Sequence, residues 1–353
     1  MKNKYDIIGL MSGTSLDGLD IAHCSFNLIE NKWDYTINVA RTIKYSQDWL
    51  KRLRNLETQS ALEFVKTDMD FGHFLGQHCL DFIQEHHIKA DFISSHGHTI
   101  FHQPELGLTS QIGSGACISA TSRLPVVCDF RSLDVALKGQ GAPLVPIGDK
   151  LLFSEYTYRL NLGGFANISF QQAEKTVAFD ICPVNMAFNY LANSLGKEFD
   201  ESGNIARSGN LNEELLKELN ALNYYTLQYP KSLGKEWFLS QFQPILDKYS
   251  ISINDKLRTV VEHTAIQISN YLSASGTLLI TGGGAYHIFF IERLKNHSNC
   301  EIIIPGNYII EYKEALIFGF IGLLRWLEQV NCLKSVTGAT ADSTTGAIYK
   351  PFN

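Results

Sequence analysis

Residues 9–20 read Gly9-Leu10-Met11-Ser12-Gly13-Thr14-Ser15-Leu16-Asp17-Gly18-Leu19-Asp20, a polar, glycine-containing turn between two β-rich runs. Those runs, Tyr5–Met11 and Leu19–Leu28, are rich in residues that favour strands. A third run, Tyr35–Ile43, follows a short turn at residues 30–32. Three strands joined by short turns form an antiparallel meander, which a dinucleotide-binding βαβ unit does not contain. The opening of the chain therefore predicts a sheet that begins as a meander.

The same order of elements returns in the second half of the chain. β-rich runs lie at Tyr156–Asn161, Ala166–Gln171 and Thr176–Asp180, and helical periodicity follows each of the two meanders. Each copy opens with a strand, a Gly/Ser/Thr turn and a strand, although the two sequences are not alike. We therefore predict an α/β fold of two similar domains, each a mixed β-sheet flanked by helices, with an interdomain cleft.

A change of composition suggests where these two domains meet. The Gly/Pro-rich stretch Lys138–Pro143 marks a crossover between the copies. We expect the first domain to comprise residues 1–135 together with about 330–353, so that the end of the chain returns to its beginning. The second domain would comprise residues 136–329. The chain has 353 residues, which agrees with two domains at about 150 residues each.

The composition excludes several classes of protein. Hydrophobic residues make up 45% and charged residues 19%, which rules out global disorder. A net charge of −6 without any basic run argues against a nucleic-acid partner, although backbone N–H groups can still bind a small phosphorylated ligand. We expect no membrane association, because no apolar run is long enough and no leader-like segment opens the sequence. Seven scattered cysteines without a Cys-x-x-Cys pair predict buried thiols in a cytoplasmic protein.

Three glycine-bearing loops are candidates for binding phosphate groups or a nucleoside. They are residues 9–20, the Gly163-Gly164 pair within Asn161–Asn167, and Gly282-Gly283-Gly284 after a buried strand. Small residues let a ligand approach the backbone closely, and hydroxyl and N–H groups bind phosphate oxygens. Asp17 and Asp20 cannot bind bare phosphate but suit Mg²⁺ or its waters. The alternative interpretation of each loop is an ordinary turn.

Asp180 is the candidate general base. It closes an apolar strand, where burial would raise its pKa toward that of a useful base. The alternative is that its side chain caps the helix predicted to start near Pro183.

Other polar residues indicate ligand contacts less specifically. His96, His98 and His102 lack the spacing of metal ligands, so we interpret them as hydrogen-bonding histidines. Arg131, at a strand end, favours a carboxylate or hydroxyl-rich ligand, or else forms a surface ion pair. Glu314, in the predicted helix 312–326, is ambiguous by itself.

Taken in order, these features resemble the anhydro-N-acetylmuramic acid kinase family, within the superfamily of actin-like and hexokinase-like ATPases. The resemblance covers nearly the whole chain. The segments that carry it are Gly9–Asp20, Ser95–Thr99, Gln111–Gly113, Val126–Asp134, Gly139–Pro146, Asn161–Asn167, Phe179-Asp180, Thr281–Ala285, Glu314-Ala315 and Ser335–Ala339. The resemblance implies duplicated actin-like (ribonuclease H-like) domains.

The resemblance also implies an activity. The expected reaction uses ATP and Mg²⁺ to phosphorylate O6 of 1,6-anhydro-N-acetylmuramic acid while water opens the anhydro bridge, in peptidoglycan recycling. Asp180 would activate that water, and Asp17 would hold Mg²⁺ directly or through water. His96, Arg131 and Glu314 would contact the sugar, with Arg131 suited to its lactyl carboxylate. The residues expected at ATP are Ser12, Gly13, Thr14, Ser15, Asp17, Gly18, Asp20, Gly163, Gly164, Asn167, Gly282, Gly283 and Gly284. A homodimer is also expected.

One segment departs from the family pattern. After the aspartate the family usually reads Thr-Gly-Pro-Gly-Asn, whereas this chain reads Ile181-Cys182-Pro183-Val184-Asn185. The bulkier residues predict a tighter, more apolar cavity beside Asp180. Two alternatives therefore stay open: a nucleotide-binding sensor with weak or no turnover, and a kinase of a different anhydro- or amino sugar.

Overall fold

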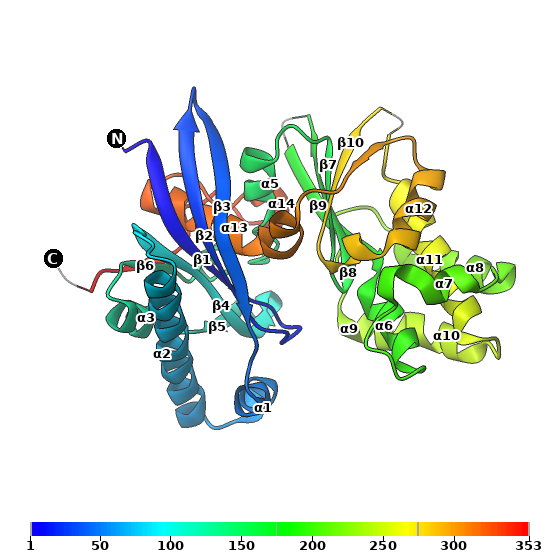
Figure 1. Cartoon of the computed structure of the whole chain (residues 1–353), viewed down its shortest axis with the longest axis horizontal. Coiled ribbons are helices and arrows are strands. Elements are labelled where there is room, and N and C mark those ends of the chain that lie inside the picture. The colour runs from blue at the N-terminus through cyan, green and yellow to red at the C-terminus, as the bar shows by residue number, and fades with distance from the viewer. Residues whose placement is uncertain (1, 174, 274, 352–353) are drawn as a thin grey trace. The chain divides into compact units, whose positions relative to one another are not determined.

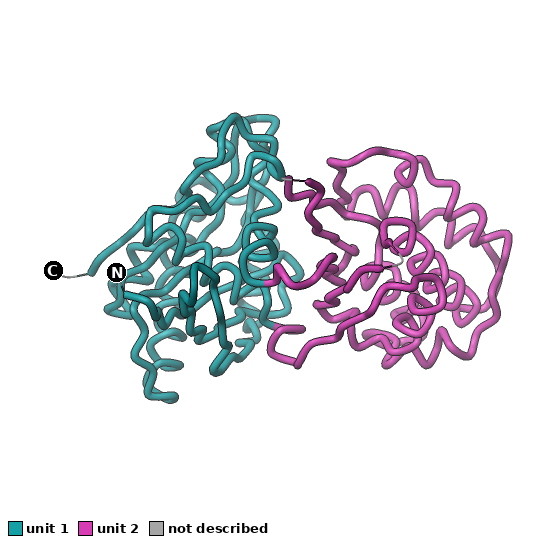
Figure 2. Tube along the Cα trace, turned by 90° about the horizontal axis from the view of Figure 1, so that it is seen from above, with its two compact units in different colours: residues 1–152, 312–353 teal, residues 153–311 magenta. Residues whose placement is uncertain are grey.

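The computed structural model describes residues 2–173, 175–273 and 275–351. The chain divides into two compact units, Met1–Leu152 with Tyr312–Asn353, and Phe153–Glu311 (Figure 2). These boundaries differ from the predicted ones, because residues 136–152 and 312–329 lie in the first unit. Helix α5 (Pro146–Leu152) contacts β3, and its Gly148 packs so closely on Ile317 that a Cβ would lie 2.6 Å from that side chain. The predicted crossover stretch, Lys138–Pro143, thus belongs to the first unit, as do residues 312–329.

The sheet of the first unit begins with the predicted antiparallel meander. Strands β1 (Lys4–Ser12), β2 (Leu19–Ile29) and β3 (Lys32–Ile43) pair in sequence, while β4 (Phe92–Gln103) and β6 (Val126–Cys128) extend the sheet as parallel strands (Figure 1). Near the end of the chain, β12 (Ala347–Tyr349) pairs antiparallel with β6, so the described part of the C-terminal segment returns to the first unit as predicted. A short hairpin strand, β5 (Leu108–Ile112), pairs with β4.

The sheet of the second unit repeats this topology. Its meander comprises β7 (Tyr158–Leu162), β8 (Phe165–Gln172) and β9 (Lys175–Pro183), and the parallel strands β10 (Thr277–Thr281) and β11 (Glu301–Ile303) follow on the side of β7. The strand order β11-β10-β7-β8-β9 matches β6-β4-β1-β2-β3 in the first unit, with the same strand directions. This repetition confirms the predicted α/β class and its duplicated, ribonuclease H-like mixed sheets.

Helices cover both faces of the first sheet. Helix α2 (Ala61–Glu85) packs on the face that carries Ile8 and Leu10, and a serine cap at Ser60 accepts a hydrogen bond from its first turn. Helix α13 (Asn307–Trp326) covers the opposite face (Figure 1). It lies so close to β1 that a Cβ on Gly9 would sit 2.0 Å from the Ala315 carbonyl oxygen. Gly9 is therefore required by helix–sheet packing.

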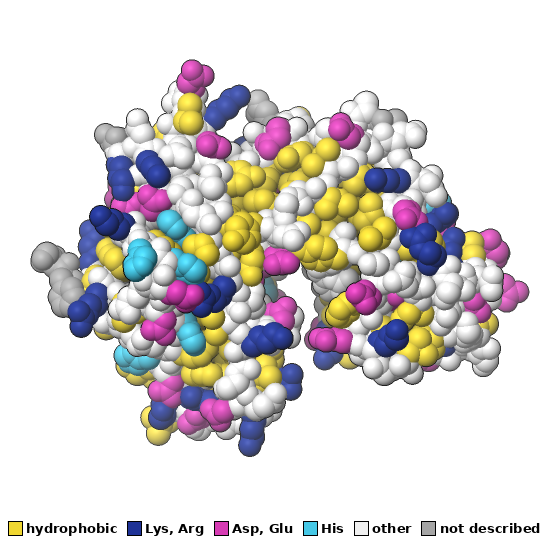
Figure 3. All heavy atoms as spheres, in the orientation of Figure 1, with side chains coloured by type: hydrophobic (Ala, Val, Ile, Leu, Met, Phe, Trp, Pro, Cys, Tyr) yellow, Lys and Arg dark blue, Asp and Glu magenta, His cyan; other side chains and the backbone are white. Residues whose placement is uncertain are grey.

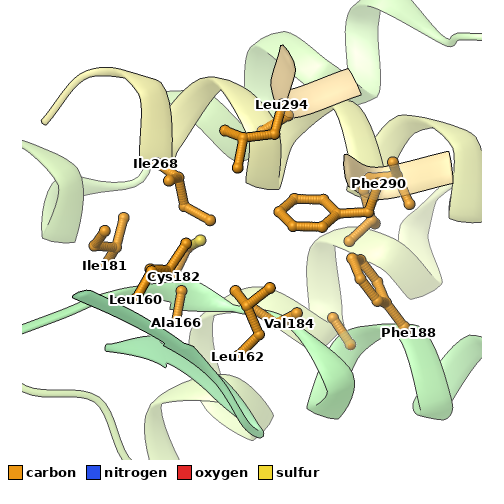
Figure 4. Packing of buried hydrophobic residues seen from close by; sticks show 14 of the residues in the cluster. Leu160, Leu162, Ala166, Ile181, Cys182, Val184, Phe188, Ile268, Phe290 and Leu294 are labelled. Carbon is orange, nitrogen blue, oxygen red and sulfur yellow. The ribbon is translucent and has the colours of Figure 1, made fainter. Parts of the chain in front are cut away.

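The hydrophobic core of the second unit lies between its sheet and three helices, α6 (Asn185–Asn193), α11 (Ile253–Ser269) and α12 (Ile288–His297). Figure 4 draws this cluster, with Leu160, Leu162 and Ala166 from the meander facing Phe290 and Leu294 from α12. The remaining helices are α1 (Gln47–Asn55), α3 (Gly115–Ser122), α4 (Ser132–Ala136), α7 (Asn204–Ser208), α8 (Glu213–Asn220), α9 (Lys235–Trp237), α10 (Gln243–Lys248) and α14 (Lys334–Thr337).

All seven cysteines are free and buried, as predicted. On the face drawn in Figure 3, acidic and basic side chains are interspersed. Within the described ranges, none of the helices is both long and apolar enough to cross a lipid bilayer.

Candidate active site

The glycine-containing loop of the first unit starts from a buried hydrogen-bond network. Ser12, at the end of β1, is 2% exposed, and its Oγ lies 2.6 Å from the Tyr45 hydroxyl and 2.8 Å from His98 Nδ1. Burial lowers the pKa of His98 to about 4, so its imidazole is neutral near pH 7. The Ser12 hydroxyl is therefore engaged inside the unit, where it fixes the start of the loop.

The tip of this loop faces solvent. Thr14, Ser15 and Asp17 are exposed, and the backbone closes a tight turn through a hydrogen bond from Leu16 N to Gly13 O at 3.2 Å. Asp20, which ends this stretch and lies on β2, accepts a hydrogen bond from the Thr42 hydroxyl at 2.6 Å. The loop thus presents two free-standing hydroxyl side chains and one carboxylate at its tip.

His96 and Arg131 form a directly bonded pair in the first unit. His96 Nδ1 lies 2.9 Å from the Gly97 carbonyl, which can only accept, so this nitrogen carries the proton. His96 Nε2 is then free to accept, and it receives hydrogen bonds from Arg131 Nε at 3.0 Å and Nη2 at 2.8 Å. Arg131 Nη1 donates to the Gly141 carbonyl at 2.6 Å. The surface ion pair considered as an alternative for Arg131 is thus wrong, because the guanidinium is bonded to buried groups.

The charges around this pair favour a neutral His96. Burial, followed by the nearby Arg131 charge, holds the pKa of His96 well below its usual range. Burial likewise lowers the pKa of Arg131 to about 10, while Glu314 counteracts this shift. Three of the five guanidinium N–H groups are used by His96 and Gly141, which leaves two for a ligand.

Glu314, on α13, is a partly buried carboxyl close to the same groups. Burial raises its pKa, the charges of Lys313 and Arg131 lower it, and that of Asp17 raises it. Among the described residues it makes no hydrogen bond or ion pair. The structure therefore brings Glu314, Arg131, His96 and the loop tip at Asp17 into one neighbourhood of the first unit.

In the second unit, the Gly163-Gly164 turn lies between β7 and β8. The Gly163 carbonyl accepts from Asn185 N at 3.2 Å, and the Gly164 carbonyl accepts from Val184 N at 2.8 Å, so both bind the start of α6. A Cβ at either glycine would meet no atom closer than 3.7 Å. Because packing does not require glycine here, the missing side chains leave the backbone open to a ligand.

The Gly282-Gly283-Gly284 turn combines two kinds of glycine. Gly282 has φ 81°, and a Cβ there would lie 2.6 Å from Asn161 Oδ1, while a Cβ on Gly284 would lie 2.7 Å from Leu162. Both are demanded by the fold. A Cβ on Gly283 would meet nothing closer than 3.7 Å, and Gly283 lines a cavity of about 450 Å³ within the second unit. This middle glycine is the one exposed to a ligand.

That cavity includes residues that the sequence did not single out. Besides Gly283 it is lined by Asn185, Phe188, Asn189, Phe199, Asp200, Glu201, Ser202, Tyr286 and His287. Phe199 and Tyr286 are among the exposed large hydrophobic side chains of the chain. Exposed aromatic residues beside polar ones are suited to a flat ring, but they lie far apart in sequence and form no motif.

Asp180 lies on β9, directly opposite Asn167 of β8. Its Oδ1 accepts a hydrogen bond from Asn167 Nδ2 at 3.1 Å, and its Oδ2 accepts one from the Leu233 backbone N–H at 3.0 Å. Burial raises the pKa of Asp180, as predicted, and these two hydrogen bonds lower it. The alternative role as a helix cap is wrong: the residue at the cap of α6 is Val184, without a side-chain cap.

The segment that departs from the family pattern packs into the core. Ile181, Cys182 and Val184 are fully buried within the hydrophobic cluster (Figure 4). The sequence predicts that these bulky side chains make the cavity beside Asp180 tighter. In the structure they instead point into the hydrophobic interior, whereas Asp180 itself is half-buried. Asn185 donates to the Leu162 carbonyl at 3.1 Å and so ties the Gly163-Gly164 turn to α6.

The sequence of the chain was compared with family models and with known proteins. The model of the anhydro-N-acetylmuramic acid kinase family matches residues 5–351. The chain belongs to this family. An anhydro-N-acetylmuramic acid kinase of Hydrogenovibrio crunogenus is 34% identical over 366 residues, covering 98% of each chain. One from Aliivibrio fischeri is 33% identical over 366 residues, covering 97% of this chain and 98% of the relative. Membership makes the chain a sugar kinase that uses ATP.

Proposed function

We propose that this family member phosphorylates 1,6-anhydro-N-acetylmuramic acid, in line with its relatives, which are named anhydro-N-acetylmuramic acid kinases. The observation that carries the proposal is Asp180, a half-buried carboxylate with one hydrogen bond on each oxygen. Each oxygen keeps a lone pair for a proton. A base near the end of a strand and beside an open glycine turn suits activation of a water molecule.

ATP binding is assigned to the three glycine loops. Gly13 to Ser15 would contact phosphate oxygens through hydroxyl and backbone N–H groups, and so would the open backbone at Gly163-Gly164. The cavity beside Gly283, with Phe199 and Tyr286 at its wall, suits the adenosine. Within this scheme Ser12, Gly18, Asp20, Asn167, Gly282 and Gly284 support the loops or Asp180 from behind.

Magnesium fits the exposed end of the first loop. Mg²⁺ prefers one or two carboxylates and completes its shell with phosphate oxygens and water. Asp17 is exposed at the loop tip, and the described residues contain no cluster of three or more His, Cys, Asp or Glu side chains that would form a closed protein site. When bound there, Mg²⁺ would offset negative charge on the transferring phosphate.

We propose that hydrolysis of the anhydro bridge and phosphoryl transfer occur together. Asp180 takes a proton from water, whose oxygen forms a bond to C1 of the sugar while the C1–O6 bond breaks. O6 forms a bond to the γ-phosphorus, and ADP leaves with the bridging oxygen.

Arg131 would donate its two remaining N–H groups to the lactyl carboxylate. His96 would act through Arg131, since its Nε2 is occupied, and Glu314 would contact a sugar hydroxyl. The product, N-acetylmuramic acid 6-phosphate, suits peptidoglycan recycling.

The test is direct incubation of the protein with ATP, Mg²⁺ and 1,6-anhydro-N-acetylmuramic acid in ¹⁸O-labelled water. We expect a product carrying phosphate on O6 and, when sampled promptly, ¹⁸O at C1. ATP binding without any phosphosugar would support the sensor alternative instead. Turnover of another anhydro- or amino sugar in preference would support the alternative substrate.

A further inference from the structure

Asp180 is contacted by a segment without regular secondary structure. Residues 227–234 form neither helix nor strand. This segment binds Asp180 at two points: Asp180 N donates to the Lys231 carbonyl at 3.3 Å, and Leu233 N donates to Asp180 Oδ2 at 3.0 Å. Residues 227–234 belong to no strand, so few backbone hydrogen bonds hold this segment, and side-chain contacts help to fix the position of the Leu233 N–H.

The Lys231 side chain supplies several of these contacts. Its Nζ donates to the Tyr224 carbonyl at 3.2 Å and to the Tyr271 hydroxyl at 3.0 Å. It also lies 4.6 Å from the centroid of the Tyr224 ring, 5.5 Å from that of Tyr271 and 5.8 Å from that of Phe179. Among the described residues, no carboxylate lies within ion-pair distance of Lys231. This half-buried cation is therefore held by aromatic rings and oxygen acceptors.

We propose that Lys231 is a positioning residue for Asp180, because it anchors the segment that brings the Leu233 N–H to Asp180 Oδ2. The inference rests on the proposed role of Asp180 as the base. Three rings and two acceptors from three separate segments of the chain fix the lysine, and two residues further on the backbone N–H reaches the carboxylate. Lys231 would thus act at a distance, through the backbone.

The consequence concerns the protonation of Asp180. The titratable groups around it are Tyr224, whose hydroxyl donates to the Asp180 carbonyl at 2.6 Å, together with Cys182, Tyr271 and Lys231 itself. Burial raises the pKa of Asp180, and the Leu233 N–H opposes that rise. A loosened segment would remove this donor, so a larger fraction of Asp180 would be protonated at a given pH.

The test compares Lys231→Met with a matched control, Lys235→Met, an exposed lysine on α9. We expect the acid limb of the pH profile of kcat/KM to move up by about one unit in Lys231→Met, and kcat/KM below the limb to fall about tenfold. The Kd for ATP stays within twofold of the parent. In Tyr271→Phe, which removes one acceptor of Lys231, the limb moves in the same direction by less.

A second measurement does not depend on turnover. Hydrogen exchange of the peptide covering residues 227–234 should accelerate at least tenfold in Lys231→Met and remain unchanged in Lys235→Met. An unshifted acid limb with unchanged exchange would overturn the inference, as would a uniform loss of activity at every pH. If the parent fails to phosphorylate the anhydro sugar, the proposed function fails, while exchange in this segment still decides whether Lys231 anchors it.

Discussion

Arg131 directs two of its N–H groups at one atom, the Nε2 of His96, with donor–acceptor distances of 3.0 and 2.8 Å. The arrangement needs a neutral imidazole with its proton on Nδ1, and the hydrogen bond to the Gly97 carbonyl fixes that tautomer. A residue that the sequence assigns to the sugar thus serves as the acceptor that orients the guanidinium.

Replacing His96 by Phe tests this arrangement. An aromatic ring is retained, but two N–H groups of Arg131 lose their acceptor, at a cost of roughly 1–3 kcal/mol in stability. We expect the KM for the sugar to rise at least tenfold while the KM for ATP changes less than twofold. Steady-state kinetics with each substrate varied in turn would measure both. An unchanged KM for the sugar would mean that Arg131 is oriented without His96.

Gly164→Ala and Gly282→Ala form a matched pair of glycine substitutions. A Cβ at Gly164 has free space, so the Tm should stay the same while the Kd for ATP rises about tenfold. Gly282 has φ 81° and a Cβ there would collide with Asn161, so strain of about 1–3 kcal/mol should lower the Tm. Thermal unfolding and nucleotide titration separate the two effects. Equal ATP affinity in Gly164→Ala and the parent would contradict the assignment of this turn to phosphate.

Stability in acid should depend on Glu262. Burial raises the pKa of this carboxyl, but hydrogen bonds from Arg293, His297 and Arg258 outweigh burial and bring the pKa to about 2. Because the folded-state pKa lies below the unfolded value of 4.5, Glu262 stabilises the fold above pH 4.5, and this contribution is lost as the pH falls toward 2.

Urea unfolding of Glu262→Gln between pH 7 and pH 2.5 measures this dependence. We expect the variant to lose roughly 2–3 kcal/mol at pH 7 and to show a flatter acid dependence than the parent. Glu292→Gln, which breaks an exposed ion pair with Arg207, should change little and serves as the control. Parallel acid profiles for Glu262→Gln and the parent would refute the assignment.

Most of the fold follows from the sequence because strand and turn patterns are local. The two meanders, the return of the chain end to β6 and the buried thiols are all predictable from runs of β-favouring residues and from cysteine spacing. The unit boundaries are not predictable from the sequence, because they depend on how α5 packs against β3 and how α13 packs against β1.

The candidate site is predictable only in part. Glycine loops and a strand-end aspartate have sequence signals, and burial of Asp180 raises its pKa in the expected direction. The hydrogen bond to Asp180 Oδ2 comes from the backbone N–H of Leu233, 53 residues later in the chain. A backbone donor leaves no signal in the identity of a side chain, so the sequence does not predict it. Likewise, the ring nitrogen that His96 offers to Arg131 depends on a tautomer set by the Gly97 carbonyl.

The Asp180→Asn variant decides whether Asp180 is the general base. Asn preserves the shape of the side chain but cannot take a proton from water, so we expect phosphosugar formation at least a thousandfold below the parent, with the Kd for ATP within twofold. The measurement is product formation from ATP and 1,6-anhydro-N-acetylmuramic acid, beside nucleotide titration of the same preparation. Turnover near the parent rate in Asp180→Asn would contradict the assignment of Asp180 as the base.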